Sequence, residues 1–368
     1  MARKAPLFIN GKFTSAGPTA VHRVAQELIA ALAEVVTDRE LRLLVPPGLA
    51  RLANDPGIPA HPVGGLAGVA WEQMSLPLHS RGGLLLSLCN RTPVAARNAL
   101  TLLHDAQAFT VPRSYPVARR LAGQWQARLA GRRQLGLLTV SHFAKGELVG
   151  LGLAPAERVH VIANGADHVL RTPPEPEILA RLGLAPRLYA LALANLMPHK
   201  NIPLLIRAFS RPALQDMTLV LVGAAGRDAF AAAGVTAGAN VLFPGYVAEG
   251  EMRALQANAL AVCTPSLTEG FGLPPVEGLM LGTPAIIAPC GALPEVCGPG
   301  ALHADPHDPA AWEAALLRLR GDNGLHDGLA REGRAFVARF TWRAAATRLM
   351  EVVDSVAPNG PEGGWKSA

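Results

Sequence analysis

Residues 259–289 read ALAVCTPSLTEGFGLPPVEGLMLGTPAIIAP, in which two short apolar runs enclose a Gly/Pro-rich turn and a helix-length segment. The runs at 259–266 and 283–289 have the length and the Ala, Val and Ile content of buried strands. The two prolines of LPPV stand where proline starts a helix well, because their missing N–H groups need no partner there. Gly282 and Pro284 then end this helix. A strand, a helix and a second strand in this order form a parallel α/β unit.

The same alternation of apolar runs and helix-length segments fills most of the chain before this stretch. A first set of runs begins near residues 5, 41, 83, 99, 136 and 158, and a second set begins near residues 188, 218 and 240. Each run is rich in Leu, Val or Ile, which predicts parallel sheets covered by helices on both faces. Ligands of such sheets bind beyond the carboxyl ends of the strands, so the residues that follow each strand are the candidates for function.

The length of the chain and the placing of its prolines predict two domains in tandem. A chain of 368 residues is too long for one ordinary domain and about right for two. Residues 173–187, PPEPEILARLGLAPR, combine prolines with mixed charge, which is typical of a linker. We therefore expect Rossmann-like domains over 1–172 and 188–339. A closing helix over 340–356 is expected to pack back towards the N-terminal domain, and the tail 357–368 to be flexible.

Composition excludes several classes of protein. No apolar run approaches the roughly 20 residues that a membrane helix needs, and Asn10, Gly11 and Lys12 cut the first apolar run too short for a signal peptide. We therefore expect a cytoplasmic protein. The cysteines are scattered without the spacing of zinc ligands, so they are expected to be reduced thiols.

Positive charge is concentrated in one segment of a chain whose formal net charge is +6. Between Asp105 and Glu147 there is no carboxylate, whereas the segment contains Arg113, Arg119, Arg120, Arg128, Arg132, Arg133 and Lys145. The segment is either a solvated helix face or a surface for anionic lipid headgroups or a phosphate-bearing acceptor. Leu121 and Trp125 lie among the arginines and favour a membrane interface. No nucleic-acid-binding motif accompanies the charge, so nucleic acid is not expected as a partner.

The turn of residues 264–276 has the chemistry of an anion site. Its backbone amides at the helix start come chiefly from Gly270, Phe271, Gly272 and Leu273. Glycines let a backbone approach a ligand closely, and a helix N-terminus attracts phosphate. Glu277 is expected in the first turn of the helix, where its carboxylate could accept hydrogen bonds from the vicinal hydroxyls of a ribose. Glu269 precedes the loop and could bind sugar hydroxyls; alternatively, one glutamate caps the helix and the other is solvated.

Taken as a whole string, TEGFGLPPVEGLMLGTPAI (268–286) resembles the E-x7-E segment of the retaining nucleotide-sugar glycosyltransferases of family 4. The resemblance implies an α/β protein with the GT-B fold, in which two doubly wound Rossmann-like domains face each other across a cleft. LANLMPHKNIPLLIRAF (193–209) resembles the phosphate-contact segment of that family, and LTLLHDAQAF (100–109) resembles its His-Asp segment. The similar segments follow the order of the family from about residue 7 to about residue 350.

The resemblance implies a role for each candidate residue. His104, Lys200 and Glu269 would be catalytic: Lys200 neutralises the diphosphate and the leaving group, His104 binds a hydroxyl of the donor sugar, and Glu269 holds the transferred sugar. The backbone of 270–273 would contact sugar and phosphate, and Glu277 would hold the ribose. Considered without the family, Lys200 would be a solvated lysine and His104 a structural histidine.

The chain also departs from the family pattern at the donor side. Many members have an arginine at the donor-binding position where this chain has Asn195, so one cation that would contact the diphosphate is missing. His199 stands at a second position where an arginine is common. In the N-terminal loop, Thr19 and Ala20 are the expected donor contacts, but Ala20 occupies the position of a glycine in many members.

The resemblance implies a hexosyltransferase of polysaccharide biosynthesis, with the acceptor on the N-terminal domain and the donor on the C-terminal domain. The GFGLPP and HDAQAF segments are most similar to bacterial mannosyltransferases of surface-polysaccharide assembly, so the first expectation for the donor is GDP-mannose. UDP-glucose and dTDP-rhamnose stay open. The expected acceptor is a saccharide or a polyprenyl-diphosphate-linked oligosaccharide, with peripheral contact to the inner face of the plasma membrane.

No metal or other cofactor is expected, since no Asp-x-Asp follows a candidate strand. The alternatives are a GT-B nucleotide-sugar epimerase and a non-catalytic protein that binds sugar nucleotides. A dinucleotide-dependent oxidoreductase fits less well, because no GxGxxG follows the first strand.

Overall fold

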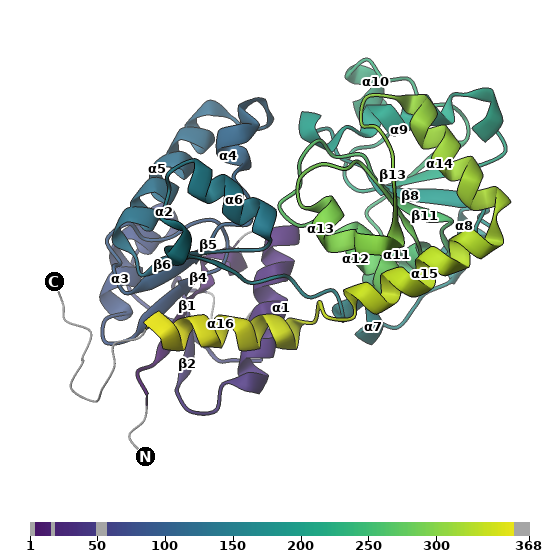
Figure 1. The fold of residues 1–368 in the computed structure, drawn as a ribbon. Helices are drawn as coiled ribbons and strands as arrows, with labels where there is room; N and C mark the ends of the chain where they lie inside the picture. Colours follow the sequence, from purple (N-terminus) through teal and green to yellow (C-terminus); the bar gives the residue numbers. More distant parts are fainter. Residues whose placement is uncertain (1–3, 16–18, 49–56, 357–368) are drawn as a thin grey trace. The chain divides into compact units, whose positions relative to one another are not determined.

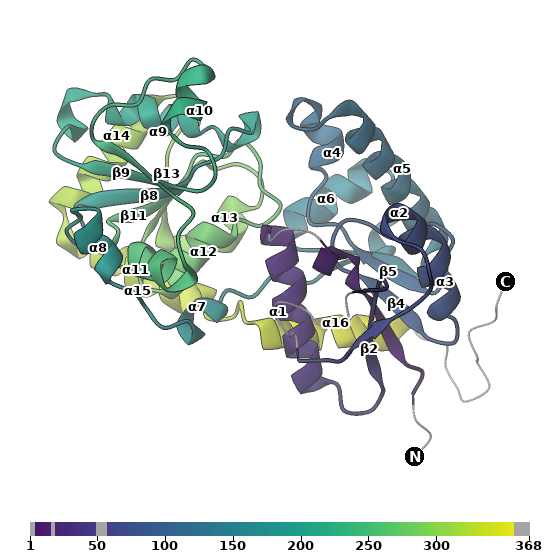
Figure 2. The same ribbon diagram turned by 180° about the vertical axis from the view of Figure 1, so that it is seen from behind.

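Two parallel sheets, one in each unit of the chain, form the framework of the structure (Figures 1 and 2). The computed structural model describes residues 4–15, 19–48 and 57–356. Unit 1 comprises residues 1–165 and 341–368, and unit 2 comprises residues 166–340. The tail expected at 357–368 lies outside the described residues.

The sheet of unit 1 has the strand order β3-β2-β1-β4-β5-β6-β7 among the described residues, and each neighbouring pair is parallel. The strands are β1 (Leu7–Asn10), β2 (Leu41–Val45), β3 (Ala60–Pro62), β4 (Leu84–Ser87), β5 (Ala99–Leu102), β6 (Gly136–Thr139) and β7 (Val159–Val161). The helices are α1 (Ala20–Val35), α2 (Gly68–Ala70), α3 (Leu76–His79), α4 (Gln107–Thr110), α5 (Val117–Arg133), α6 (His142–Gly150) and α16 (Trp342–Val356).

The sheet of unit 2 has the strand order β10-β9-β8-β11-β12-β13 in the described chain, again with parallel neighbours. The strands are β8 (Tyr189–Leu193), β9 (Thr218–Val222), β10 (Val241–Gly245), β11 (Ala261–Thr264), β12 (Ala285–Ile287) and β13 (Ala301–His303). The helices are α7 (His168–Arg171), α8 (Glu177–Arg181), α9 (Ile202–Phe209), α10 (Arg227–Ala232), α11 (Glu249–Asn258), α12 (Leu273–Met280), α13 (Leu293–Cys297), α14 (Pro309–Gly321) and α15 (Asn323–Val337).

The strands of unit 2 bury side chains on both faces, as their continuous apolar sequences predict. Successive side chains of a strand point to opposite faces. In β8, Ala190 and Ala192 pack into the core shared with α9 and α14, whereas Tyr189 and Leu191 pack into the core shared with α8 and α11. The alternation places one hydrophobic layer on each side of the sheet, which is the doubly wound arrangement.

Two short strands and one helix were not expected from the sequence. β3 and β13 lie at edges of their sheets and contain three residues each, so they carry no apolar run long enough to signal a strand. The segment 173–187, expected to be a linker, contains α8 instead. Ile178 is 1% exposed and packs with Leu182 and Leu184 against β8, so this segment belongs to the core of unit 2. Its prolines flank the helix rather than interrupt it.

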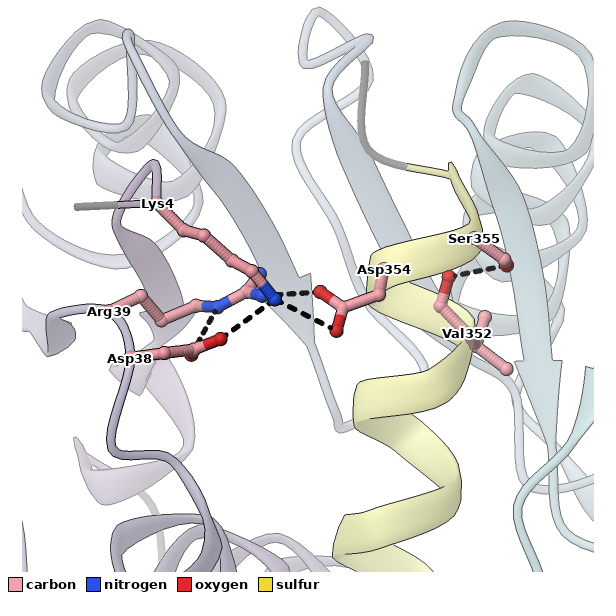
Figure 3. Close-up of polar contacts among 6 residues, drawn as sticks. All are labelled: Lys4, Asp38, Arg39, Val352, Asp354 and Ser355. Carbon is pink, nitrogen blue, oxygen red and sulfur yellow. Dashed lines mark hydrogen bonds and ion pairs between the residues drawn. The ribbon is translucent and has the colours of Figure 1, made fainter. Parts of the chain in front are cut away.

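The last described helix, α16, belongs to unit 1 and packs against α1. Figure 3 shows the polar contacts at its carboxyl end, where Asp354 pairs with Lys4 and with Arg39. Lys4 also pairs with Asp38, with Nζ 2.7 Å from Oδ2, and this contact lowers the pKa of the Asp38 carboxyl. Lys4, Asp38 and Asp354 are about half exposed, so the buried apolar residues of α16 contribute most of its attachment.

Within the described part of the chain, no helix has the length and the apolar character required to cross a membrane. The four cysteine thiols, Cys89, Cys263, Cys290 and Cys297, are unpaired. Burial raises the pKa of Cys263 and Cys297 to about 12, so these thiols stay protonated at neutral pH.

Candidate functional site

The strand order of unit 2 reverses between β8 and β11, which are hydrogen-bonded neighbours. In doubly wound sheets, ligands bind beyond the carboxyl ends of the strands at such a reversal. The segments that follow these two strands are 194–201 and 265–272, the same segments that carry Lys200 and Glu269. The topology of unit 2 therefore brings together two motifs that are distant in the sequence.

Hydrogen bonds join the two segments directly. The backbone N–H of Leu267 donates to the carbonyl of His199 at 2.7 Å. Asn201 adopts a left-handed conformation, with φ of 55°, between the short 3₁₀ turn Pro198–Lys200 and α9. Its side-chain amide donates to the carbonyls of Pro265 and Pro306, at 3.2 and 2.8 Å. Asparagine is among the few residues that tolerate this conformation, so Asn201 both turns the chain and holds the neighbouring loop.

Lys200 and Glu269 form an ion pair at this position. Lys200 Nζ lies 2.7 Å from Oε1 and 2.8 Å from Oε2 of Glu269, and the Ser266 hydroxyl donates to Oε1 at 2.7 Å. The side chains of Lys200 and Glu269 are 27% and 13% exposed, so both charges are partly removed from water. The structure thus brings together two of the three expected catalytic residues. Their catalytic roles stay predictions.

The start of α12 lies directly after Glu269. Gly272 has φ of 101°, a left-handed conformation that favours glycine, and a Cβ there would lie 2.6 Å from Leu293 Cδ2. Leu273 is the first residue of the helix. Phe271 is 5% exposed, and its ring packs edge-on against Phe340 at 5.5 Å, so its side chain belongs to the core. Only the backbone of Phe271 can therefore serve a ligand without unpacking the core.

Glu277 lies in the second turn of α12, and the expectation that it belongs to the first turn is wrong. The helix begins at Leu273, which makes Glu277 its fifth residue. Its carboxylate is held by side chains from other helices. Gln256 Nε2 of α11 donates to Oε2 at 2.7 Å, and His168 Nε2 of α7 lies 3.3 Å from Oε1. Side-chain contacts, rather than the helix dipole, therefore orient this carboxylate.

Two of three expected donor contacts, Asn195 and Thr19, have local partners in the structure. Asn195 Oδ1 accepts a hydrogen bond from the backbone N–H of Met197 at 2.8 Å, which stabilises the loop after β8. Thr19 caps α1, because its hydroxyl accepts from the N–H of His22 at 3.3 Å. Ala20, the first residue of α1, is exposed. A contact between any of these residues and a donor stays a prediction.

His104 follows β5 in unit 1 and is buried. Its Nε2 lies 2.9 Å from the carbonyl oxygen of Leu88, so Nε2 carries the proton, and its backbone N–H donates to Asn90 Oδ1 at 2.8 Å. Burial lowers the pKa of His104 to about 4, because the imidazolium would lose its hydration. At neutral pH His104 is a neutral imidazole, with Nδ1 as the ring atom able to accept a hydrogen bond.

His199 does not replace the positive charge of the arginine that is common at its position. Burial, together with the neighbouring Lys200 ammonium, lowers the pKa of His199 to about 4. The ring is therefore neutral at neutral pH and leaves Lys200 to supply the cation of this loop.

We expect acid to destabilise unit 1 through His104. Its pKa is about 4 in the folded protein and about 6.5 in an unfolded chain, so unfolding takes up a proton between these values. The stabilisation is complete above pH 6.5 and is lost as the pH falls towards 4. Between pH 7.5 and pH 5 the free energy of unfolding should fall by about 2 kcal/mol from this group. Urea unfolding at both pH values measures the change.

The control for this prediction is His104→Gln, whose side-chain N–H can still donate to the Leu88 carbonyl. This variant should lose less stability on acidification than the wild type, and His199 should supply part of the remaining pH dependence with the same sign. Equal pH slopes for the two proteins would contradict the assignment.

The basic segment of unit 1 divides between two faces of α5. Val117, Leu121 and Trp125 are 60%, 53% and 56% exposed and recur every four residues, so they form one stripe along the helix. Arg128 and Arg132 continue this stripe at helical spacing. Of the other expected surface residues, Arg113, Arg119 and Arg133 are exposed and Arg120 is half-buried, and Arg119 and Arg120 also line a cavity. The arginines are therefore not one continuous surface.

Three residues of the site were missed by the sequence analysis. Ser266 could have been noticed beside Glu269, but Gln256 and His168 lie in other helices and reach Glu277 only through the tertiary fold. In residues 4–15, 19–48 and 57–356, no group of three or more His, Cys, Asp or Glu side chains is arranged to hold a metal ion.

Comparisons with known proteins agree with this architecture. Residues 175–356 match the family of glycosyl transferases group 1. The O-antigen chain mannosyltransferase B of Escherichia coli is 30% identical over 268 residues, which cover 70% of this chain and 70% of that protein.

Solved structures resemble the whole chain. Sucrose-phosphate synthase of Thermosynechococcus elongatus has a TM-score of 0.75 at 18% identity, covering 96% of this chain and 99% of that chain. HepE of Anabaena in complex with UDP-glucose has a TM-score of 0.72 at 18% identity, covering 96% and 100%. These findings confirm the expected fold class and the resemblance to bacterial mannosyltransferases. The chain belongs to the glycosyl transferases of group 1 and has the GT-B fold.

Proposed function

We propose that this glycosyltransferase moves a hexose from a nucleotide sugar to a saccharide or a polyprenyl-diphosphate-linked oligosaccharide in polysaccharide biosynthesis, with retention of configuration as in family 4. Our first choice of donor is GDP-mannose. We further propose that the enzyme works in the cytoplasm, at the inner face of the plasma membrane.

The observation that carries this proposal is the Lys200–Glu269 pair at the strand reversal of unit 2. An ammonium group has three N–H donors, and two of them are directed at the Glu269 carboxylate. The third can donate to a phosphate oxygen of the donor. Lys200 would then stabilise the negative charge that develops as the nucleoside diphosphate departs.

The surroundings of Glu269 favour a binding role over a nucleophilic one. Its carboxylate accepts from both Lys200 and Ser266, and these contacts stabilise the anion and lower its reactivity. Oε1 accepts from both Lys200 and Ser266, whereas Oε2 accepts from Lys200 and keeps capacity for a further hydrogen bond, so Glu269 can still bind a hydroxyl of the transferred sugar. In the mechanism that we propose, the acceptor attacks from the face that the leaving group vacates. The leaving phosphate accepts the acceptor's proton, and no covalent bond to the enzyme forms.

Glu277 is proposed to bind the ribose of the donor. Gln256 and His168 each contact one of its oxygens, and a carboxylate can accept about four hydrogen bonds in all, so two vicinal hydroxyls can be bound beside such contacts. Because both partners are nearly buried, with exposures of 1% for Gln256 and 5% for His168, the carboxylate is held in one orientation before the donor binds.

A panel of nucleotide sugars tests the activity and identifies the donor. GDP-mannose, UDP-glucose and dTDP-rhamnose are each incubated with the enzyme, with and without an acceptor lipid extract, and the released nucleoside diphosphate is measured. The name of the Escherichia coli relative supports mannose, whereas the Anabaena structure contains UDP-glucose. We expect the fastest acceptor-dependent release from GDP-mannose.

The outcomes of this panel separate the proposed function from its alternatives. Faster diphosphate release from another donor would replace mannose as the proposed sugar but would leave the proposed transferase activity intact. Conversion of the sugar without diphosphate release would indicate an epimerase, and binding without either reaction would indicate a non-catalytic protein. The anomeric configuration of the product, read by NMR, tests retention.

We expect the exposed stripe of α5 to bind anionic membranes. Apolar side chains beside arginines are typical of a helix that lies in a membrane interface, and each arginine near an anionic surface contributes about 1 kcal/mol. Arg128→Gln together with Arg132→Gln should therefore weaken binding to vesicles that contain phosphatidylglycerol by about thirtyfold. Cosedimentation with vesicles at constant salt measures the change.

The matched control replaces Arg331 and Arg334 with glutamine, which removes the same charge from exposed positions of α15 in unit 2. This variant should bind vesicles like the wild type. Equal losses in the two variants would indicate attraction by net charge alone, and no loss in either would contradict a membrane role for α5.

A further inference from the structure

Unit 1 contains a cavity of about 580 Å³ that lies entirely within its own residues. The volume falls in the range of about 300–1,000 Å³ that is typical of small-molecule sites. Asn10 and Lys12 line it from the end of β1, Asn90 and Arg91 from the segment after β4, and Asp105 from the segment after β5. The cavity therefore opens at the carboxyl ends of three strands.

These strands include the reversal point of the sheet. In the order β3-β2-β1-β4-β5-β6-β7 the sequence of strands reverses between β1 and β4, which are paired neighbours. A doubly wound sheet binds its ligands at this place. The cavity of unit 1 thus occupies the position that corresponds, within its own sheet, to the Lys200–Glu269 site of unit 2.

One wall of the cavity is the face of α5 that does not carry the exposed apolar stripe. Arg119, Arg120, Gly123 and Ala127 line the cavity and recur at spacings of three or four residues. Gly123 has no side chain, and an added Cβ there would meet no atom within 4 Å, so the wall is open at this point. Arg119 and Arg120 are directed to the cavity by helix geometry, not to the stripe that contains Arg128.

The charge of the cavity lining is positive once its internal ion pair is considered. Glu72 is 1% exposed, and its Oε2 lies 2.6 Å from Lys12 Nζ, while Asn10 Nδ2 donates to Oε1 at 3.2 Å. This pair is neutral as a whole. The other charged side chains of the described lining are three arginines, Arg91, Arg119 and Arg120, and one carboxylate, that of Asp105. Positive charges therefore outnumber negative ones. An anionic ligand is favoured by this balance.

The arginines also have unused hydrogen-bonding capacity. In the described ranges, neither Arg119 nor Arg120 forms an ion pair. Arg120 donates from Nη1 to the Pro112 carbonyl at 3.4 Å, but its buried Nε has no partner among the described residues. A buried N–H without a partner costs about 1–3 kcal/mol, which a ligand oxygen would recover. Guanidinium groups bind phosphate and carboxylate with particular geometric fit.

The rest of the lining suits a sugar ring. Phe13, Phe109 and Tyr115 contribute aromatic surface, and Asn90 and Asp105 contribute polar groups that can exchange hydrogen bonds with hydroxyls. Apolar walls with a few convergent polar groups are typical of sites that bind small ligands.

We propose that this cavity binds an acidic saccharide, one that carries a phosphate or a carboxylate, and that Arg119 and Arg120 recognise its anionic group. The identification of this saccharide as the acceptor rests on the glycosyl transfer proposed above. The basic segment then has two separate functions: Arg119 and Arg120 select the acceptor, and Arg128 and Arg132 contact the membrane.

Ligand-observed NMR titration of the full chain, without donor, tests the site directly. Glucose 6-phosphate, glucuronate, glucose and inorganic phosphate are the four probes. We expect both acidic sugars to bind at least about tenfold more tightly than glucose. Whichever of the two binds more tightly shows whether the site prefers a phosphate or a carboxylate. Inorganic phosphate should bind more weakly than glucose 6-phosphate, because it lacks the ring contacts.

The decisive variant is Arg119→Gln with Arg120→Gln, and the matched control is Arg132→Gln with Arg133→Gln, which removes equal charge from exposed positions of the same helix that do not line the cavity. The first should weaken binding of the acidic sugars at least about tenfold, and the second should leave it unchanged. Circular dichroism melting of each variant checks that unit 1 is folded. Equal affinity for glucose and the acidic sugars, equal effects of the two variants, or phosphate binding as tight as that of glucose 6-phosphate would overturn the proposal.

Donor turnover, measured on the same proteins, separates this proposal from the proposed function. If the enzyme releases nucleoside diphosphate but shows no preference for acidic sugars, the proposed acidic-saccharide site is wrong and the proposed transferase activity stands. Binding of acidic sugars that requires Arg119 and Arg120, without turnover of any donor, would keep the site and overturn the transfer reaction.

Discussion

Replacing Lys200 with alanine is expected to lower kcat by about 10²–10³-fold, the effect typical of removing one group that stabilises developing negative charge. Lys200 is the cation that the loop after β8 presents to Glu269, and the neighbouring His199 is neutral. Without the ammonium group, the departing diphosphate loses its partner, and Glu269, only 13% exposed, loses its counter-charge. Initial rates of nucleoside diphosphate release at saturating donor measure the effect.

The matched control is Arg207→Ala, which removes a cation from an exposed position of α9 in the same unit. Arg207→Ala should retain kcat within about twofold. A second variant, Lys200→Ala with Glu269→Gln, removes the uncompensated carboxylate and should recover stability without recovering kcat. Near-normal turnover of Lys200→Ala would remove this residue from the mechanism, and recovery of turnover in the double variant would limit its role to neutralising the Glu269 carboxylate.

Replacing Gly291 with alanine should also abolish most of the activity, although this residue contributes no functional group. Gly291 has φ of 63°, and an added Cβ would lie 2.5 Å from the backbone N and 2.7 Å from the carbonyl O of Glu269. Backbone atoms cannot give way as a flexible side chain can, so the Glu269 loop must shift. The loop is also fixed by the Ala292 N–H, which donates to the Glu269 carbonyl at 3.0 Å. A displacement of about 1 Å at a reaction centre can cost about 10²-fold in rate.

The variant Gly282→Ala is the control that distinguishes displacement of the Glu269 loop from backbone strain at a left-handed glycine. Gly282 has φ of 87°, also left-handed, but an added Cβ there would meet no atom within 4 Å. Both variants pay the strain of about 1–2 kcal/mol for a non-glycine residue in this conformation. We expect both to have lower melting temperatures and only Gly291→Ala to lose activity. Equal activity of the two variants would show that the position of the Glu269 loop does not limit the reaction.

Most of the fold could be predicted because its strands are locally marked. β8 and β11 are apolar runs that end in loops, and all of their side chains except that of Leu193 are buried, on both faces of the sheet. The three-residue edge strands β3 and β13 could not be predicted, since an edge strand pairs on one side only and needs no apolar run. The linker expected at 173–187 was inferred from its prolines, but the apolar spacing of α8 decided its burial in unit 2.

The candidate site could be predicted only in part. Lys200 and Glu269 stood out because their motifs follow strands and resemble a known family, and the strand order then placed the two motifs together. The surroundings of Glu277 could not be anticipated. Gln256 and His168 come from helices that precede it by many residues and have no pattern of their own. Likewise, the sequence presented the arginines of α5 as one group, whereas packing assigned them to different faces.

By itself, the sequence determined most of the segments that become strands and helices, and their order, because apolar periodicity and turn residues act over a few neighbouring positions. It also determined the chemistry available after each strand. Only the tertiary structure decided which of these groups meet, since contacts between Lys200 and Glu269, or between His168 and Glu277, depend on how strands pair and helices pack. Such contacts join residues far apart in the chain, and no local pattern encodes their distance or their orientation.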